Sequence, residues 1–289
     1  MVDETDIVPF GFLPFDYHVM ATWDPNSPFS KKQQHRVLVE SWLRLGKHGR
    51  NKYPAGDDPP DEFPLHVPQD LMTEEERALD GQISRVFWIR TWYGQKDDKA
   101  SQDAADVAYS RLRIMVMQDG DPNVTNSCLE EECIFESKEE FGPDIITTPE
   151  GDTNPDFEDG IARGTPGSVP SYLITALMHY PDTFEGLSRR EWHWPHISDE
   201  TLPDLEKWQD LMIVVADRKA CEEGWVLFLA VNHHGKILPF RARERASWTE
   251  QMIANYLDGQ KLDENTSDSD KEMEFYLRGG SGWDPDSVP

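Results

Sequence analysis

Oxygen-bearing side chains recur between residues 119 and 130 with the spacing of a calcium-binding loop. Positions 1, 3, 5, 7, 9 and 12 of an EF-hand-type loop would be Asp119, Asp121, Asn123, Thr125, Ser127 and Glu130, and calcium prefers such hard oxygen ligands. That loop requires a glycine at position 6, where this sequence has Val124, and Pro122 stiffens position 4. Calcium binding by Asp119, Asp121, Asn123 and Glu130 is therefore an alternative, and a solvated acidic loop is the simpler interpretation.

Histidines gather in two short segments that could supply zinc ligands. The segments are Trp192-His193-Trp194-Pro195-His196 and Asn232-His233-His234-Gly235. Cys221 or Asp217 could complete a ligand set, since zinc prefers imidazole and thiolate, but the spacings match no zinc motif. The second segment lies between two strand-like segments, where Asn and Gly favour the backbone conformations of a hairpin turn. A turn is therefore the preferred interpretation of the second segment.

Asp217 follows an apolar run, and α/β proteins often place functional side chains at the ends of buried strands. Together with His233, His234 and Arg241 it forms the candidate catalytic set of an enzyme of unfamiliar type, with a cleft at the ends of the central strands. Strand-end acids also cap helices, which is the simpler role for Asp217. The sequence has no G-x-S-x-G, G-x-G-x-x-G, phosphate-cradling or H-E-x-x-H motif, so the common hydrolase, oxidoreductase, NTPase and zincin classes lack support. We expect no cofactor.

The elements that would position these residues are clearest between Leu211 and Arg241. Two apolar runs, 211–216 and 225–231, have strand length, are rich in Val, Ile and Phe, and are followed by a shorter segment at 236–241. Their near-continuous apolar character indicates that both faces of the sheet are covered. A capped helix beginning near Thr201 leads into these strands, and a capping box at Ser247-Trp248-Thr249-Glu250 opens the helix that follows them.

The remaining segments predict further helices and strands. Helices are predicted from Ser30 to a stop at Gly46 or Gly49, from Thr73 to Gly81 and over 101–109, and strands over 85–91 and 111–117. Residues 130–141 predict one amphipathic helix, and 172–178 fit a strand or a short buried helix equally. The pattern predicts an α/β fold, a mixed β-sheet with flanking helices plus an N-terminal helix and Pro-rich arm, with α+β as the alternative.

Composition suggests how the chain is divided. Residues 1–69 are predicted to be an arm and helix that pack on the core, 70–260 the α/β domain with an acidic insertion at about 119–165, and 261–289 an acidic, mostly mobile tail. Trp23-Asp24-Pro25-Asn26-Ser27 is echoed by Trp283-Asp284-Pro285-Asp286-Ser287. Two turns anchored by tryptophan are the simpler interpretation, and docking motifs for equivalent grooves are the alternative.

Charge and cysteine usage limit the partners and the compartment. The 289 residues include 55 acidic and 28 basic ones, a net charge of −27, which opposes docking on nucleic acid or an anionic membrane surface. The odd number of cysteines, Cys128, Cys133 and Cys221, suits a reducing compartment, and the C-x4-C spacing of the first two is not the usual C-x2-C of zinc sites. With no signal-peptide pattern and no membrane-spanning run, a cytoplasmic location is predicted, with a nuclear one as the alternative.

Four short pieces resemble an uncharacterised domain family of fungal and actinobacterial proteins. They are Phe87-Trp88-Ile89-Arg90-Thr91, the strand ending Val215-Ala216-Asp217, the strand reaching Phe240-Arg241, and the helix that contains Asn255 with the acidic stretch behind it. The resemblance covers about residues 85–278 and implies an α/β fold; the family has no established activity, so it supplies no catalytic residues. We predict a non-enzymatic binding or regulatory module, whose partner is a protein or a small molecule and which could form a homo-oligomer.

Overall fold

The computed structural model describes residues 7–53, 64, 66–79, 85–117, 129, 131–142, 166–184, 186, 205–264 and 279–283. The predicted calcium ligands Asp119, Asp121, Asn123 and Glu130 lie outside these residues, as do the histidine segment 192–196 and most of the acidic insertion and tail. The chain forms two compact units built from discontinuous segments. We call residues 1–84, 173–208 and 232–235 the helical unit, and residues 85–172, 209–231 and 236–289 the sheet unit.

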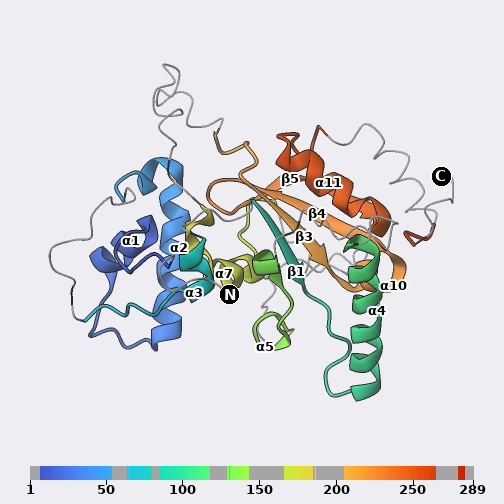
Figure 1. Cartoon of the computed structure of the whole chain (residues 1–289), viewed down its shortest axis with the longest axis horizontal. Coiled ribbons are helices and arrows are strands. Elements are labelled where there is room, and N and C mark those ends of the chain that lie inside the picture. The colour runs from blue at the N-terminus through green and yellow to red at the C-terminus, as the bar shows by residue number, and fades with distance from the viewer. Residues whose placement is uncertain are drawn as a thin grey trace. The chain divides into compact units, whose positions relative to one another are not determined.

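The described part of the sheet unit contains a five-stranded sheet in the order β2-β1-β3-β4-β5 (Figure 1). The strands are β1 (Val86–Arg90), β2 (Ile134–Phe135), β3 (Leu211–Ala216), β4 (Trp225–Val231) and β5 (Ile237–Arg245). β1 pairs in parallel with β2 and β3, whereas β4 pairs antiparallel with β3 and β5. The prediction of an α/β fold with a mixed sheet and flanking helices is confirmed.

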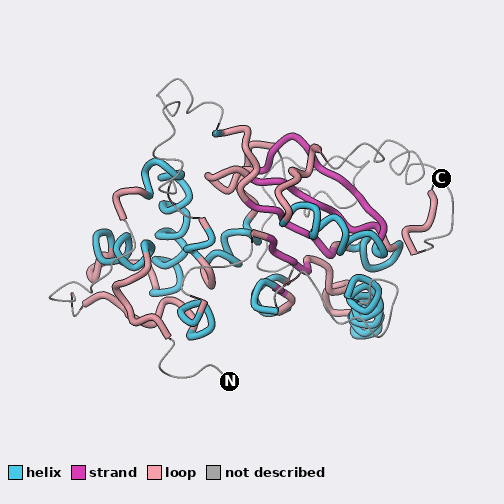
Figure 2. Tube along the Cα trace, turned by 45° about the horizontal axis from the view of Figure 1, so that its top comes forward, coloured by secondary structure: helices cyan, strands magenta, loops and turns pink. Residues whose placement is uncertain are grey.

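Both faces of β3 and β4 are covered, as their apolar runs predict, and every residue of the two strands is buried. The flanking helices are α4 (Lys99–Met117), α10 (Arg218–Glu223) and α11 (Thr249–Leu257). They pack on the face that carries Met212, Val226 and Phe228, and α11 lies against the strands in both views (Figures 1 and 2). On the opposite face, Phe87 packs edge-on against Phe135, with ring centroids 5.0 Å apart. Consecutive apolar residues are therefore needed, because neither face of these strands is solvated.

The predicted strand at 111–117 is wrong, because these residues form the second half of α4. The buried side chains of this helix are Ala105, Tyr109, Leu112 and Val116, which recur every three or four residues and, from Tyr109 on, pack with the sheet core. Seven residues are too few to separate a helical period from a strand period. The longer window that begins at Ala105 shows the helical one.

Three other predicted elements also change. Residues 131–141 form a 3-10 turn, η1 (Glu131–Cys133), then β2 and the short helix α5 (Lys138–Phe141), rather than one helix, because Ile134 and Phe135 pair with β1. Residues 171–177 are helix α7 (Ser171–Leu177). The helix after β5 is preceded by η3 (Ala246–Trp248), and its N-cap is Trp248 rather than Ser247, with no side-chain cap bond.

The helical unit is centred on α1 (Pro14–Thr22) and α2 (Lys31–Arg50), whose rings Phe15 and Trp42 pack edge-on with centroids 5.7 Å apart. Ser30 caps α2 and Thr73 caps α3 (Glu74–Ala78), each by accepting a backbone N–H three residues later, so both helices begin where the sequence predicts. The α2 helix spans Lys31–Arg50, but its backbone is not helical at Gly46, one of the two predicted stops. Among the described residues, no helix combines the length and the apolar character needed to cross a bilayer.

A buried cluster of charged groups links α1 and α3. Arg77 donates to both carboxylate oxygens of Asp16, at 3.0 and 3.3 Å, and both side chains are buried. The neighbouring Glu76 is fully buried, and burial together with the Asp182 carboxylate raises the pKa of Glu76 well above its usual value. The folded protein therefore holds a proton on Glu76 at pH values where the unfolded chain has released it.

Replacing Glu76 with glutamine is expected to stabilise the protein at neutral pH. Because the folded-state pKa is raised, the unfolded chain binds fewer protons above its own pKa, and stability falls by about 1.4 kcal/mol per pH unit until the folded-state pKa is reached. The neutral amide of Glu76→Gln removes this loss. Thermal melting should show the variant more stable than the wild type at about pH 7, with the difference vanishing near about pH 4.

The exposed Glu75 of the same helix supplies the control, since Glu75→Gln should leave the melting temperature nearly unchanged at both pH values. Equal melting temperatures for Glu76→Gln and the wild type at neutral pH would contradict a buried, protonated carboxyl group.

Candidate functional site

Asp217, in the sheet unit, stabilises the fold. It caps α10 by accepting the Ala220 N–H at 3.0 Å, the role that its strand-end position predicts. The Arg243 guanidinium donates to both of its carboxylate oxygens, one of them at 2.8 Å, and also to the Trp225 carbonyl at 2.8 Å. Both side chains of this ion pair are almost completely buried. Arg241, the other predicted residue in this unit, is half-buried on β5 opposite Leu229. Asp217 is thus held by the fold through both of its oxygens.

Asp217→Asn is expected to destabilise the protein by about 3–5 kcal/mol, because it leaves the Arg243 charge buried without its counter-ion. Asparagine still caps a helix, so the loss reports the ion pair rather than the cap. Urea unfolding followed by circular dichroism measures the change. Glu222→Gln breaks the exposed Arg218–Glu222 pair of the same helix and should cost less than about 1 kcal/mol. Equal costs for the two variants would show that the Asp217–Arg243 pair is not a structural element.

His233 and His234, the other two candidate residues, belong to the helical unit and form the turn between β4 and β5. Asn232 Oδ1 accepts the His234 N–H at 3.0 Å, and the Asn232 carbonyl accepts the Gly235 N–H at 2.8 Å. Gly235 has a φ of 70°, which glycine adopts without strain. The predicted turn explains Asn232 and Gly235, but it does not explain two histidines at its tip.

The two histidine rings lie on an interruption of α2 at Gly46, whose φ of 61° and ψ of 176° are not helical. A Cβ at Gly46 would lie 2.5 Å from His234 Cε1 and 2.7 Å from His233 Nδ1, so a side chain here would collide with both rings. In an uninterrupted helix the Lys47 N–H would donate to the Leu43 carbonyl. Here the Lys47 N–H donates to His233 Nδ1 at 3.0 Å, and the Leu43 carbonyl lies 2.8 Å from His234 Nδ1.

These contacts determine where the ring protons lie. His233 Nδ1 accepts from an amide, so the proton of the neutral ring is on Nε2. His234 Nδ1 faces a carbonyl oxygen and must donate, which leaves its Nε2 for a different partner. The two rings stack at a tilt with centroids 4.1 Å apart. The histidine pair thus replaces one helical hydrogen bond with two side-chain bonds.

Glu206 completes a cluster with both histidines. Its Oε1 lies 3.0 Å from His234 Nε2 and 3.9 Å from His233 Nε2. Asn232 Nδ2 donates to Glu206 Oε2 at 3.1 Å and to the Glu206 carbonyl at 2.8 Å, which orients the carboxylate. Because an unprotonated His234 Nε2 and a carboxylate both present lone pairs, a proton or another cation must lie between them.

Burial differs across this cluster. His233 is 6% exposed, and burial followed by the neighbouring His234 lowers the pKa of His233 to about 3, so its ring is neutral at physiological pH. Its Nε2 is buried without a hydrogen-bond partner in the described part of the chain. The side chains of His234 and Glu206 are 19% and 42% exposed, so solvent reaches the cluster from their side.

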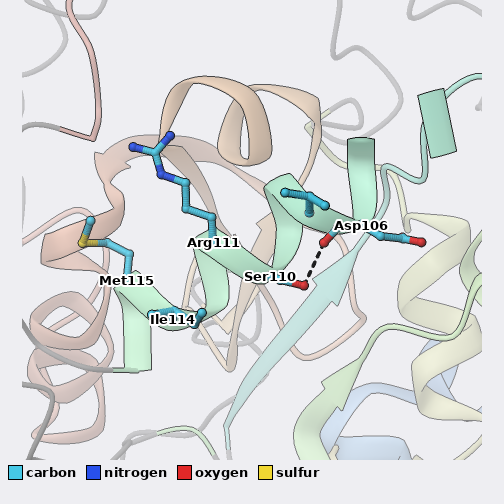
Figure 3. A pocket seen from close by; sticks show the side chains of 6 residues that line it. Asp106, Ser110, Arg111, Ile114 and Met115 are labelled. Atoms are coloured by element: carbon cyan, nitrogen blue, oxygen red, sulfur yellow. Dashed lines mark hydrogen bonds between the residues drawn. The ribbon is translucent and has the colours of Figure 1, made fainter. Parts of the chain in front are cut away.

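A second feature, the outer face of α4 in the sheet unit, carries exposed apolar side chains. Val107 is 72% exposed and Ile114 is 55% exposed, and seven residues of helix place them two turns apart on one stripe. A shallow, mostly apolar hollow of about 540 Å³ follows this stripe and is lined by Asp106, Val107, Ser110, Arg111, Ile114 and Met115 (Figure 3). The Ser110 hydroxyl donates to the Asp106 carbonyl, so it is bonded within the helix (Figure 3).

The described parts of the two Trp-Asp-Pro motifs make different contacts; residues 284–287 of the second lie outside the described residues. In the first, Asp24 Oδ1 accepts the Asn26 N–H at 2.9 Å, which is a local turn. In the second, Trp283 Nε1 donates to the Glu222 carbonyl at 3.0 Å, and the Arg111 guanidinium lies 4.1 Å from the Trp283 ring centroid. Trp283 therefore packs on α10 and α4 of its own sheet unit, whereas Trp23 belongs to the helical unit.

Comparison of the chain with protein-family models, curated proteins and solved structures gives no match. The resemblance of residues 85–278 to an uncharacterised domain family stays a prediction. The function of this chain must therefore be inferred from its own geometry.

The sequence pointed to the two histidines but not to the residues that organise them. Gly46 carries a recognisable signal, because a glycine inside an otherwise regular helical pattern marks a stop or a close approach. Glu206 carries none, since it is one of 55 acidic residues and lies 27 positions before His233.

Proposed function

We propose that this protein is a non-enzymatic binding module that docks a basic amphipathic helix of a partner protein on the outer face of α4. The observation that carries the proposal is the exposed stripe of Val107 and Ile114 over the 540 Å³ hollow. Recognition of one helix by another uses apolar anchors three, four and seven residues apart, and Val107 and Ile114 have the last of these spacings.

The stripe is not needed for the core of the sheet unit. Tyr109, Leu112 and Val116 already bury the inner face of α4 against the strands. Single exposed apolar residues are ordinary on protein surfaces, but two of them on one stripe, beside the half-buried Met115 and around a hollow, form a contact surface.

Charge favours a basic partner. The net charge of −27 attracts cationic segments and repels a second copy of the chain. The carboxylates of Asp103 and Asp106 lie towards the N-terminal end of the stripe and are about 60% exposed. They pair with Lys99 and Arg90, so lysines of a docked helix would share these carboxylates with those cations. Self-association through α4, the alternative, would bring like charges together.

The other two predicted functions have weaker support. An enzyme that uses Asp217 would need a carboxylate available to substrate, and both Asp217 oxygens accept bonds from Arg243. Calcium binding concerns Asp119, Asp121, Asn123 and Glu130, which lie outside the described residues and stay a prediction.

A labelled 18-residue amphipathic helix of leucine and lysine is expected to bind the wild-type protein in a fluorescence-anisotropy titration. The double variant Val107→Asp/Ile114→Asp should bind it at least about tenfold more weakly, because two apolar anchors are lost. Binding that depended on charge alone would instead strengthen, since the variant carries two more negative charges.

The matched control is Val37→Asp/Leu257→Asp, which adds the same charge at two apolar residues of similar exposure, 43% and 46%, on other helices. It should bind the peptide at least as tightly as the wild type. Equal peptide binding by the two double variants would overturn the proposal. So would sedimentation that shows the wild type as a dimer and Val107→Asp/Ile114→Asp as a monomer.

A further inference from the structure

We propose that Glu206, His233 and His234 form a site for a single divalent transition-metal ion such as Zn²⁺. This inference is independent of partner docking on α4. One ligand atom from each of the three side chains converges, with all three atoms within 4.8 Å of one another. Two imidazoles and a carboxylate are a ligand set that zinc accepts.

His234 already has the orientation of a metal ligand. Its Nδ1 lies 2.8 Å from the Leu43 carbonyl, and a histidine that donates through one ring nitrogen presents the other nitrogen to a metal. That other nitrogen, Nε2, lies 3.0 Å from Glu206 Oε1, and Asn232 holds the second oxygen of the same carboxylate. The ion would take the place of the proton that these two groups share, and that proton would pass to solvent.

His233 supplies the independent second observation. The side chain is more than nine-tenths buried, and its Nε2 lies 3.9 Å from Glu206 Oε1 without a hydrogen-bond partner among the described residues. A buried polar nitrogen in that condition destabilises the fold unless something binds it. Once the ring proton has moved to Nδ1, an ion between His234 and Glu206 would give Nε2 a partner.

Binding through His233 requires one rearrangement. The ring proton must move from Nε2 to Nδ1, where the Lys47 N–H now donates, so the Lys47 hydrogen bond must break. Losing the hydrogen bond from the Lys47 N–H to His233 has a cost in stability that the imidazole–metal bond must exceed. Metal binding is therefore coupled to the interruption of α2 at Gly46.

The arrangement favours zinc-like ions over calcium or magnesium. Calcium and magnesium prefer all-oxygen sites, whereas two of the three ligands here are imidazole nitrogens. Three protein ligands leave a fourth position for water, and the partly exposed side chains of His234 and Glu206 provide the path by which an ion enters.

Calorimetric titration of ZnCl₂ into untagged, metal-free protein tests the proposal. The wild type should bind one ion per chain at this site, and Glu206→Gln, His233→Ala and His234→Ala should each weaken it at least about tenfold, the loss of one ligand. An exposed histidine of the same unit, His66, gives the control, because His66→Ala should bind zinc like the wild type. No stoichiometric zinc binding by the wild type, or wild-type affinity in the Glu206 and His234 variants, would overturn the proposal.

A second measurement needs only the wild-type protein, so its result does not depend on whether the variants fold. Amide hydrogen exchange resolved by residue should show the Lys47 amide exchanging faster once zinc is added, because His233 Nδ1 no longer accepts from it. Unchanged exchange at Lys47 in the zinc-loaded protein would contradict His233 as a ligand.

Discussion

The helical unit depends on how α2 is interrupted. At Gly46 the helix loses the hydrogen bond between the Lys47 N–H and the Leu43 carbonyl, and a backbone group left unpaired in the interior costs about 1–3 kcal/mol. The rings of His233 and His234 bind both groups. They come close enough only because Gly46 has no Cβ. The two backbone groups of α2 that lose their helical hydrogen bond therefore explain why two histidines, distant from α2 in the sequence, occupy the turn between β4 and β5.

The same constraint orients the histidines for chemistry. Since each Nδ1 is taken by the backbone of α2, each Nε2 is left for Glu206, which Asn232 holds in place. For His234 the structural role and the proposed metal site follow from one arrangement. For His233 the two compete, because coordination through Nε2 requires breaking its bond with the Lys47 N–H. Asp217 shows the opposite outcome, because a helix cap and the Arg243 ion pair occupy both of its oxygens.

Features encoded in neighbouring residues could be predicted from the sequence. The features are the buried strands 211–216 and 225–231, the helix starts at Ser30 and Thr73, the turn at 232–235 and the capping role of Asp217. All of them depend on residues a few positions apart. Residues 111–117 were misassigned as a strand because a short apolar window fits both periods. The role of Glu206 and the contact of Gly46 with His234 could not be predicted from the sequence. Glu206 and His234 lie about 160 and 190 positions after Gly46, and only the folded chain brings them together.

The proton positions of the two rings show whether the histidine pair completes the interrupted helix. A long-range ¹H–¹⁵N correlation spectrum of protein labelled with ¹⁵N-histidine distinguishes the two nitrogens of each ring. We predict that, without metal, neutral His233 carries its proton on Nε2, whereas His234 is protonated on Nδ1. A His233 ring protonated on Nδ1, or a His234 ring without a proton there, would contradict the account that the histidine pair completes the interrupted helix.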